Sequence, residues 1–151
     1  MAPDMQAVSI TGMVAIAIGD SVARAQNLVV TGGLQRMASL LAGSVSNTTV
    51  GWYVELGTGT TAVSSGNTAL ATPQTSTWKQ VGAVTSSSAT TTLETVYNAA
   101  SAIGTWTELG LFAGATATAG SGTMVARVLV PWTKSSSQYA TVTWSITFTA
   151  L

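Results

Sequence analysis

Two stretches of the chain alternate apolar and polar residues with a period of two. From Val8 to Ile18 the even positions are apolar or glycine, and the odd positions are mostly small or polar. From Tyr139 to Thr149 an apolar row that includes Trp144 alternates with a row of mostly hydroxyl side chains. Successive side chains of a strand point to opposite faces, so both stretches are predicted to be half-buried strands, with Trp144 in the core.

Shorter strands are expected between these two stretches. Glycine, serine and alanine runs that are typical of turns separate them. Pro131 should end its strand or lie at a sheet edge, because proline cannot donate to a ladder. About seven short strands predict a mainly β fold, an antiparallel sandwich or barrel of jelly-roll-like or tulip-like form. The intervening candidates are Thr49–Leu56, Trp78–Thr85, Thr90–Asn98, Trp106–Phe112 and Thr123–Val130.

One helix is predicted near residues 32–42. Thr31 can cap it, Gly32 and Gly33 open it, and Gly43 follows its end. Its apolar residues recur at the helical spacing i, i+3, i+4 and i+7. We expect this stripe to pack on the core, with an interaction face as the alternative. The stripe consists of Leu34, Met37, Ala38 and Leu41.

Charge is scarce along the chain. Five Lys and Arg balance five Asp and Glu, which makes 7% charged residues and a formal net charge of +0. A typical soluble domain carries about 25% charged residues. The composition gives no electrostatic footprint for nucleic acid, and neither a basic leader nor an apolar span for a membrane is apparent. A neutral surface protects poorly against association, so we expect an oligomer or a larger assembly.

Catalytic equipment is limited by the residues that the chain lacks. The absence of cysteine and histidine excludes thiolate nucleophiles, a histidine base and the commonest ligands of transition metals. We therefore expect no enzyme, no metal and no cofactor. A two-carboxylate glycanase stays as an alternative if two of Glu55, Glu94 and Glu108 face one cleft.

Two local motifs admit a structural and a chemical interpretation. The stretch Gly57–Thr61 resembles a phosphate-binding loop, but a tight turn after a strand is favoured because the lysine and following helix of such loops are missing.

Glu108 precedes an apolar run and is expected to be partly buried. It needs a cationic or N–H partner, and an ion pair with Arg127 on a following strand is favoured over acid catalysis.

The five tryptophans divide into two groups. Trp52 and Trp144 lie on the apolar faces of their strands and are assigned to the core. Trp78, Trp106 and Trp132 lie near strand ends, where subunit contacts and ligand contacts are both open interpretations.

An ordered set of short motifs extends this interpretation. The motifs are Asn27–Leu34, Ser39–Gly43, Val54–Thr61, Asn67–Leu70, Thr107–Phe112, Gly122–Val128 and Thr141–Phe148. Their order resembles a family of small tailed-bacteriophage virion proteins, which comprises tail-fibre-like, minor structural and capsid decoration proteins. The resemblance covers about residues 27–149 and implies a β-rich, often trimeric domain without enzymatic activity, in which Glu108 and Arg127 are structural.

The resemblance leads to a functional hypothesis. Residues 1–26 are expected to form an N-terminal strand or arm, and residues 27–151 a β-sandwich virion domain. We expect a capsid decoration (cement) protein that binds the major capsid protein on the outer head surface as a homotrimer, because a receptor-binding fibre usually adds a shaft or a long C-terminal tip to a domain of 151 residues. Three alternatives remain: a tail-fibre or baseplate protein that binds tail components or host glycans, a small-ligand barrel, and the glycanase.

Overall fold

The computed structural model describes residues 7–45 and 51–151. Within them nine antiparallel strands form one curled sheet in the order β4-β3-β7-β8-β2-β1-β9-β6-β5. The predicted fold class, a mainly β antiparallel fold with one short helix, is confirmed. The elements are β1 (Val8–Ile18), β2 (Ser21–Val29), α1 (Thr31–Leu41), β3 (Trp52–Gly57), β4 (Pro73–Gln80), β5 (Ala83–Ser87), β6 (Thr90–Tyr97), β7 (Gly104–Ala113), β8 (Thr123–Lys134) and β9 (Ala140–Ala150).

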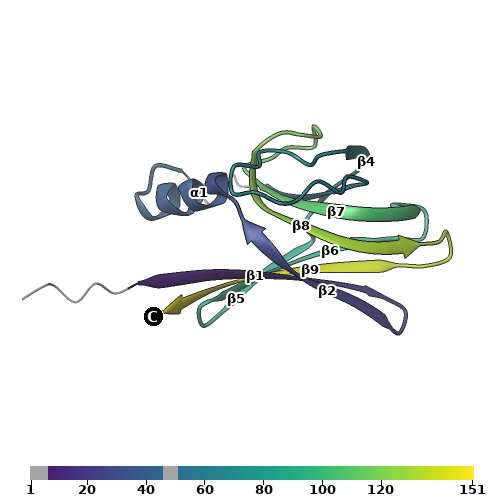
Figure 1. Cartoon of the computed structure of the whole chain (residues 1–151), viewed down its shortest axis with the longest axis horizontal. Helices are drawn as coiled ribbons and strands as arrows, with labels where there is room; N and C mark the ends of the chain where they lie inside the picture. The colour runs from purple at the N-terminus through teal and green to yellow at the C-terminus, as the bar shows by residue number, and fades with distance from the viewer. Residues whose placement is uncertain (1–6, 46–50) are drawn as a thin grey trace, which may run out of the picture.

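The sheet curls into two layers that face each other. In Figure 1 the layer of β1, β9, β2 and β5 lies below the layer of β7, β8 and β4, and α1 lies at one end. β2 joins the layers, because it pairs with β1 along most of its length and with β8 only at Leu28 and Val29. The main core fills the space between the layers, and its largest members include Trp144, Trp106, Trp132, Tyr97, Leu109, Leu111 and Ile16.

The strongest alternating patterns form the central strands of the lower layer. β1 has the predicted bounds, and β9 begins and ends within one residue of its prediction. The two strands pair over ten residues, from Val8 opposite Ala150 to Ala17 opposite Thr141. The boundary predicted between residues 26 and 27 falls inside β2, a strand that the sequence pattern did not reveal.

The segment predicted as one strand over Trp78–Thr85 is two strands, so that prediction is wrong. β4 pairs with β3 at one edge of the sheet, and β5 pairs with β6 at the other edge. The chain crosses between these edges at Val81 and Gly82, whose N–H groups donate to the carbonyls of Trp52 and Glu94 at 2.8 Å each. Residues 49 and 50 of the predicted strand Thr49–Leu56 lie outside the described residues.

Pro131 does not end its strand, which continues to Lys134. The ladder with β7 pairs Leu129 with Glu108 and Trp132 with Trp106, and a bulge between them passes over Pro131. β2 pairs with β8 only at residues 126 and 127. β8 is an interior strand of the sheet, so Pro131 lies at a bulge and not on an edge strand, and no paired residue requires its missing N–H.

The helix has the expected place, but its cap and its exposed face differ from the prediction. Val30 is the N-cap and makes no side-chain cap bond, so Thr31 is not the cap. A side chain at Gly33 would collide with the backbone of Val125, so this glycine lets the first turn lie on β8. Met37 packs against the core, but Leu34 is 45% exposed and Leu41 is 92% exposed. A core-facing stripe is thus wrong for both leucines.

Candidate functional site

The predicted ion pair between Glu108 and Arg127 is confirmed. Glu108 on β7 and Arg127 on β8 point to the outer face of the upper layer, away from the main core. The Arg127 Nη2 lies 2.7 Å from the Glu108 Oε2, and the Arg127 Nε donates to the same oxygen at 3.1 Å. Both side chains are almost fully inaccessible to solvent, with exposed fractions of 0% and 1%. A buried pair of this kind needs further hydrogen bonds to offset its desolvation.

Those further bonds come from the segment between β3 and β4. The Glu108 carboxylate accepts from the N–H of Gly59 at 3.0 Å, of Ala71 at 3.0 Å and of Thr72 at 2.7 Å. Thr107 adds a bond from its hydroxyl to the Gly59 carbonyl at 2.9 Å. One carboxylate thus ties together the two ends of residues 58–72.

The guanidinium of Arg127 holds the middle of the same segment. It donates to the carbonyl of Thr61 at 2.9 Å, to the carbonyl of Ala62 at 3.4 Å and to the Asn67 Oδ1 at 3.0 Å. Because Glu108 and Arg127 each bond to the segment and to each other, residues 58–72 are clamped flat on the sheet. We call the outer surface of β3, β7 and β8 under this segment the clamped face.

A second apolar cluster completes the clamped face. Tyr53 and Trp78 stack with ring centroids 5.2 Å apart, and Phe112 lies 5.0 Å from Trp78. The Trp78 indole N–H donates to the Thr116 carbonyl at 2.9 Å. Leu70 from the clamped segment is buried in the same cluster. This face therefore has its own small core outside the main one.

The stretch Gly57–Thr61 is the start of this long segment, so the favoured interpretation as a tight turn is wrong. A Cβ at Gly57 would lie 2.5 Å from the Glu108 Oε1, and one at Gly59 would collide with the same oxygen. The glycines are needed because the carboxylate approaches the backbone closely. The Gly59 amide, which a phosphate would require, is already used by Glu108.

The charge environment fixes the protonation of Glu108. Burial alone would raise the pKa of its carboxyl group. The amides of Thr72 and Ala71 and the charge of Arg127 outweigh that effect and hold the pKa below its usual value. Glu108 is therefore an ionised structural group at neutral pH, with its oxygens already occupied by donors.

Glu55 lies on the same outer side of β3 and has the opposite perturbation. Burial raises the pKa of its carboxyl group, and repulsion from Glu108 raises it further. Glu55 is buried, and Glu94 lies on β6 in the other layer. Glu55 and Glu108 are thus neighbours, but both are covered, so the shared open cleft expected for a glycanase is not formed by this pair.

Three of the remaining predicted residues lie in the core. Trp144 is fully buried, as predicted, and its indole N–H has no hydrogen-bond partner among the described residues. Trp106 and Trp132, for which two roles were open, are both buried in the main core. Trp52 is only partly buried and packs against that core.

Lys134 is a buried residue whose role the sequence did not reveal. It begins the polar stretch Lys134–Ser137, a pattern typical of an exposed hairpin tip, but Lys134 is the last residue of β8 and is 1% exposed. Its Nζ donates to the carbonyls of Ala99 at 3.2 Å and Ser135 at 3.3 Å. The tip itself begins at Ser135.

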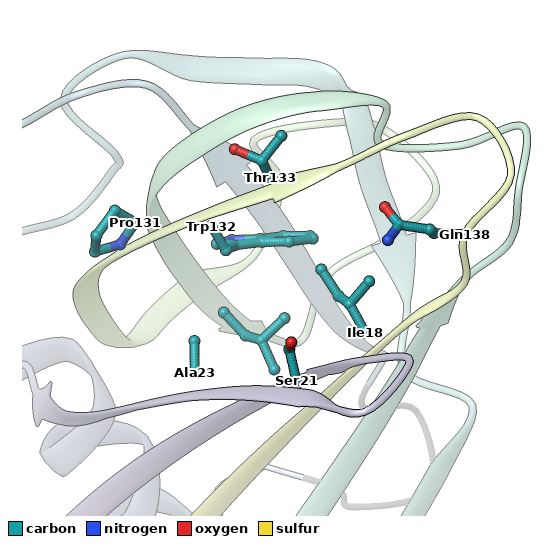
Figure 2. Close-up of a pocket in the computed structure, with 8 residues that line it drawn as sticks. Ile18, Ser21, Ala23, Pro131, Trp132, Thr133 and Gln138 are labelled. Carbon is teal, nitrogen blue, oxygen red and sulfur yellow. The ribbon is translucent and has the colours of Figure 1, made fainter.

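A surface cleft of about 250 Å³ opens between the β1–β2 turn and the β8–β9 hairpin (Figure 2). Trp132 crosses its centre in the view, with Ile18 and Ser21 on one side and Thr133 on the other. The Trp132 indole N–H is buried and has no hydrogen-bond partner within the described chain. The cleft is smaller than the roughly 300–1,000 Å³ of typical ligand pockets and is not the internal apolar cavity expected of a ligand barrel.

Comparison with known proteins adds no relative. No protein-family model, curated protein or solved structure matches this chain. Among residues 7–45 and 51–151, no group of three or more carboxylate, histidine or cysteine side chains could hold a metal ion. In the same residues no helix has the length and hydropathy needed to cross a membrane.

Proposed function

We propose that this chain is a non-enzymatic structural protein of a tailed-bacteriophage virion. In this proposal it binds the major capsid protein on the outer head surface as an oligomer and stabilises the head. The main support for this proposal is the set of bonds by which Glu108 and Arg127 hold residues 58–72. Four of the short motifs that define the resemblance meet there, because Gly59, Asn67, Glu108 and Arg127 come from Val54–Thr61, Asn67–Leu70, Thr107–Phe112 and Gly122–Val128 in turn.

The use of charged groups supports a structural role. Glu108, Arg127 and Lys134 are buried and bonded within the fold. Each is engaged by partners of the chain itself, which leaves it unavailable to a substrate. Buried charges that hold segments of their own chain in place suit a structural role better than a catalytic one.

The sheet edges support assembly. β4 and β5 are the two terminal strands of the sheet, and all five residues of β5 are exposed. Unpaired edge groups are a template for pairing with another chain, and an oligomer on a lattice would cover them. A homotrimer, which the resemblance implies, would cover three equivalent edges.

Electron microscopy of reconstituted particles tests the proposal. Purified protein is added to virions or empty heads that lack it, and the particles are imaged with and without the addition. Regular added density on the capsid is expected, and its symmetry gives the oligomer at each position. Density confined to the tail would overturn head decoration in favour of the tail-fibre or baseplate alternative. Absence of binding to both would contradict a virion role.

A further inference from the structure

The outer surface of the lower layer differs from the clamped face, because in Figure 1 the only described segments on that side are strands of the layer itself, such as β5 at its edge. We call this surface, formed by β2, β1, β9 and β6, the open face. β1 and β9 run along its centre, and their outward residues are small or hydroxylic. These residues are Thr11, Ala15, Ala17, Thr141, Thr143, Ser145 and Thr147, together with the longer Met13.

One row of this face carries opposite charges at its two ends. The registers place Arg24 beside Ala15, Ala15 beside Thr143, and Thr143 beside Glu94. Arg24 and Glu94 are both exposed. They stand three strand spacings apart, about 14 Å, which is too far for contact within one chain.

The rows on either side also end in residues that could contact each other between two copies, but these residues are uncharged. The row on one side has an exposed valine at each end, Val22 on β2 and Val96 on β6. The row on the other side has Gln26 at one end and Thr92 at the other. Each row thus ends in two groups that complement each other: cation and anion, valine and valine, amide and hydroxyl.

We infer that the open face is the contact surface for a second copy of this chain, packed face to face about a two-fold axis parallel to the strands. An axis between β1 and β9 places β2 of one copy over β6 of the other. Arg24 then faces Glu94 of the second copy, and the reciprocal pair forms on the other side. Val22 and Gln26 face the second copy's Val96 and Thr92 in the same way. A two-fold contact must be self-complementary, and these rows meet that condition.

The geometry of packed sheets suits this arrangement. Facing sheets lie about 10 Å apart, a gap that an arginine and a glutamate can span together. Small central residues let the layers approach closely. Four strands of about eight to ten residues cover roughly 600 Å² of flat area, and side-chain relief brings this near the roughly 800 Å² per partner of a standard interface.

Charge-reversal variants test the pairing, and the measured quantity is the mass of the protein oligomer in solution. Wild type, Arg24→Glu, Glu94→Arg and the double variant R24E/E94R are compared by sedimentation velocity over a dilution series. Each single variant places like charges opposite each other twice, so we expect its dissociation constant to rise at least tenfold, as several kcal/mol of like-charge cost implies. The double variant restores both pairs and should return to the wild-type association.

Ser136→Arg and Ser136→Glu are the matched controls, because Ser136 is exposed in the turn between β8 and β9, outside both the open face and the two edge strands. Both should associate like wild type. Circular dichroism of every variant distinguishes lost association from lost folding.

Three results would overturn the inference. One is a monomeric wild type, and another is a double variant that stays dissociated while folded. The third is a trimer or other oligomer whose mass is the same in the wild type and in both single variants. That result would exclude this contact but would not contradict the proposed virion role. If the wild type is monomeric and Glu94→Arg instead abolishes binding to heads, the open face binds the capsid and not a second copy.

Discussion

The clamped face and the open face are the two outer surfaces of one curled sheet. A segment of the same chain covers the first, and no described segment covers the second. On the clamped face, residues 58–72 cover the strands, and Glu108 and Arg127 bond to this segment from below. On the open face the strands carry hydroxyl and alanine side chains, Met13, Gln26, two exposed valines and two exposed charged side chains, and no described segment outside that layer covers them. The first surface is completed within the chain, and the second is completed by another molecule in the arrangement that we infer.

The comparison shows where a chain with so few charges places them. The buried pair of the clamped face organises a long segment that has little regular structure of its own. The exposed pair on the open face cannot close within one molecule, because three strand spacings separate its members. The same two residue types thus hold a folded segment on one side and, in the pair that we infer, join two copies on the other.

The largest effect is expected from Arg127→Met. Removal of one partner leaves the Glu108 carboxylate charged and buried, which costs about 3–5 kcal/mol of unfolding free energy. The same change on the open face, Arg24→Met, removes a solvated charge and should cost about 0.5 kcal/mol or less in the monomer. Urea denaturation of both variants measures the difference. Equal losses in the two variants would break the distinction between the faces.

A smaller loss is expected from Gly59→Ala. The added methyl group would meet the Glu108 carboxylate, which its hydrogen bonds prevent from moving away. Overpacking of this kind costs about 1–3 kcal/mol. Gly66→Ala in the same segment is the matched control, since its Cβ would have only the Ser64 hydroxyl at 4.0 Å. A neutral result for both variants would show that the segment is not held as closely as its contacts indicate.

Glu55 predicts a pH dependence that belongs to the clamped face. Its pKa is raised in the fold, so the folded chain binds this proton more tightly than the unfolded chain. Stability is therefore lost as the pH rises from the usual value of 4.5 through the raised pKa. Glu55→Gln should remove that loss. Chemical denaturation between pH 4.5 and 8 measures this loss of stability. Glu94→Gln, at an exposed position, is the control. Both variants are measured at a concentration at which the chain is monomeric.

Glu108 predicts the opposite trend at lower pH. Its folded pKa lies below its usual value, so the stability it provides is fully present above 4.5 and is lost as the pH falls through the folded pKa. Acid unfolding of Glu108→Gln should be less steep than that of the wild type. An unchanged slope would mean that another group controls acid unfolding.

The smallest effect on folding is expected from Thr143→Lys, at the centre of the open face. Its side chain points to solvent in the single chain, so unfolding of the monomer should change by about 0.5 kcal/mol or less. The same variant should weaken pairing, because the long lysine side chain would hold the two layers apart and its ammonium group, beside Glu94, would compete with Arg24 of the second copy. Loss of stability in the dilute monomer would place Thr143 in a different environment.

The sequence revealed those elements whose period-two pattern is strong. β1 and β9 alternate cleanly because one side of each faces the core, and the Glu108–Arg127 pair followed from an acidic residue beside an apolar run. β2 was missed because Ala23 and Ala25 give a weak apolar signal on its inner side.

Other features depend on contacts distant in the chain, which a local pattern does not contain. The hold on residues 58–72 requires amides 36 to 49 residues away from Glu108 to converge on its carboxylate. The division of β4 from β5 depends on which sheet edge each strand joins. The exposure of Leu34 and Leu41 follows from how α1 lies on β8, which no helical periodicity specifies.

The most direct test of the central claim, that the open face is completed by a second copy, is cross-linking between single-cysteine variants. The chain has no cysteine of its own, so Arg24→Cys and Glu94→Cys each carry one thiol. In the inferred pair, position 24 of one copy and position 94 of the other lie about 10 Å apart, and two copies of position 24 lie about 17 Å apart. The reciprocal native charge pair remains intact in the mixed pair. A short bismaleimide linker should therefore join the mixture of both variants efficiently and each variant alone poorly. Equal yields in the mixture and in the separate variants, or none at all, would contradict the claim.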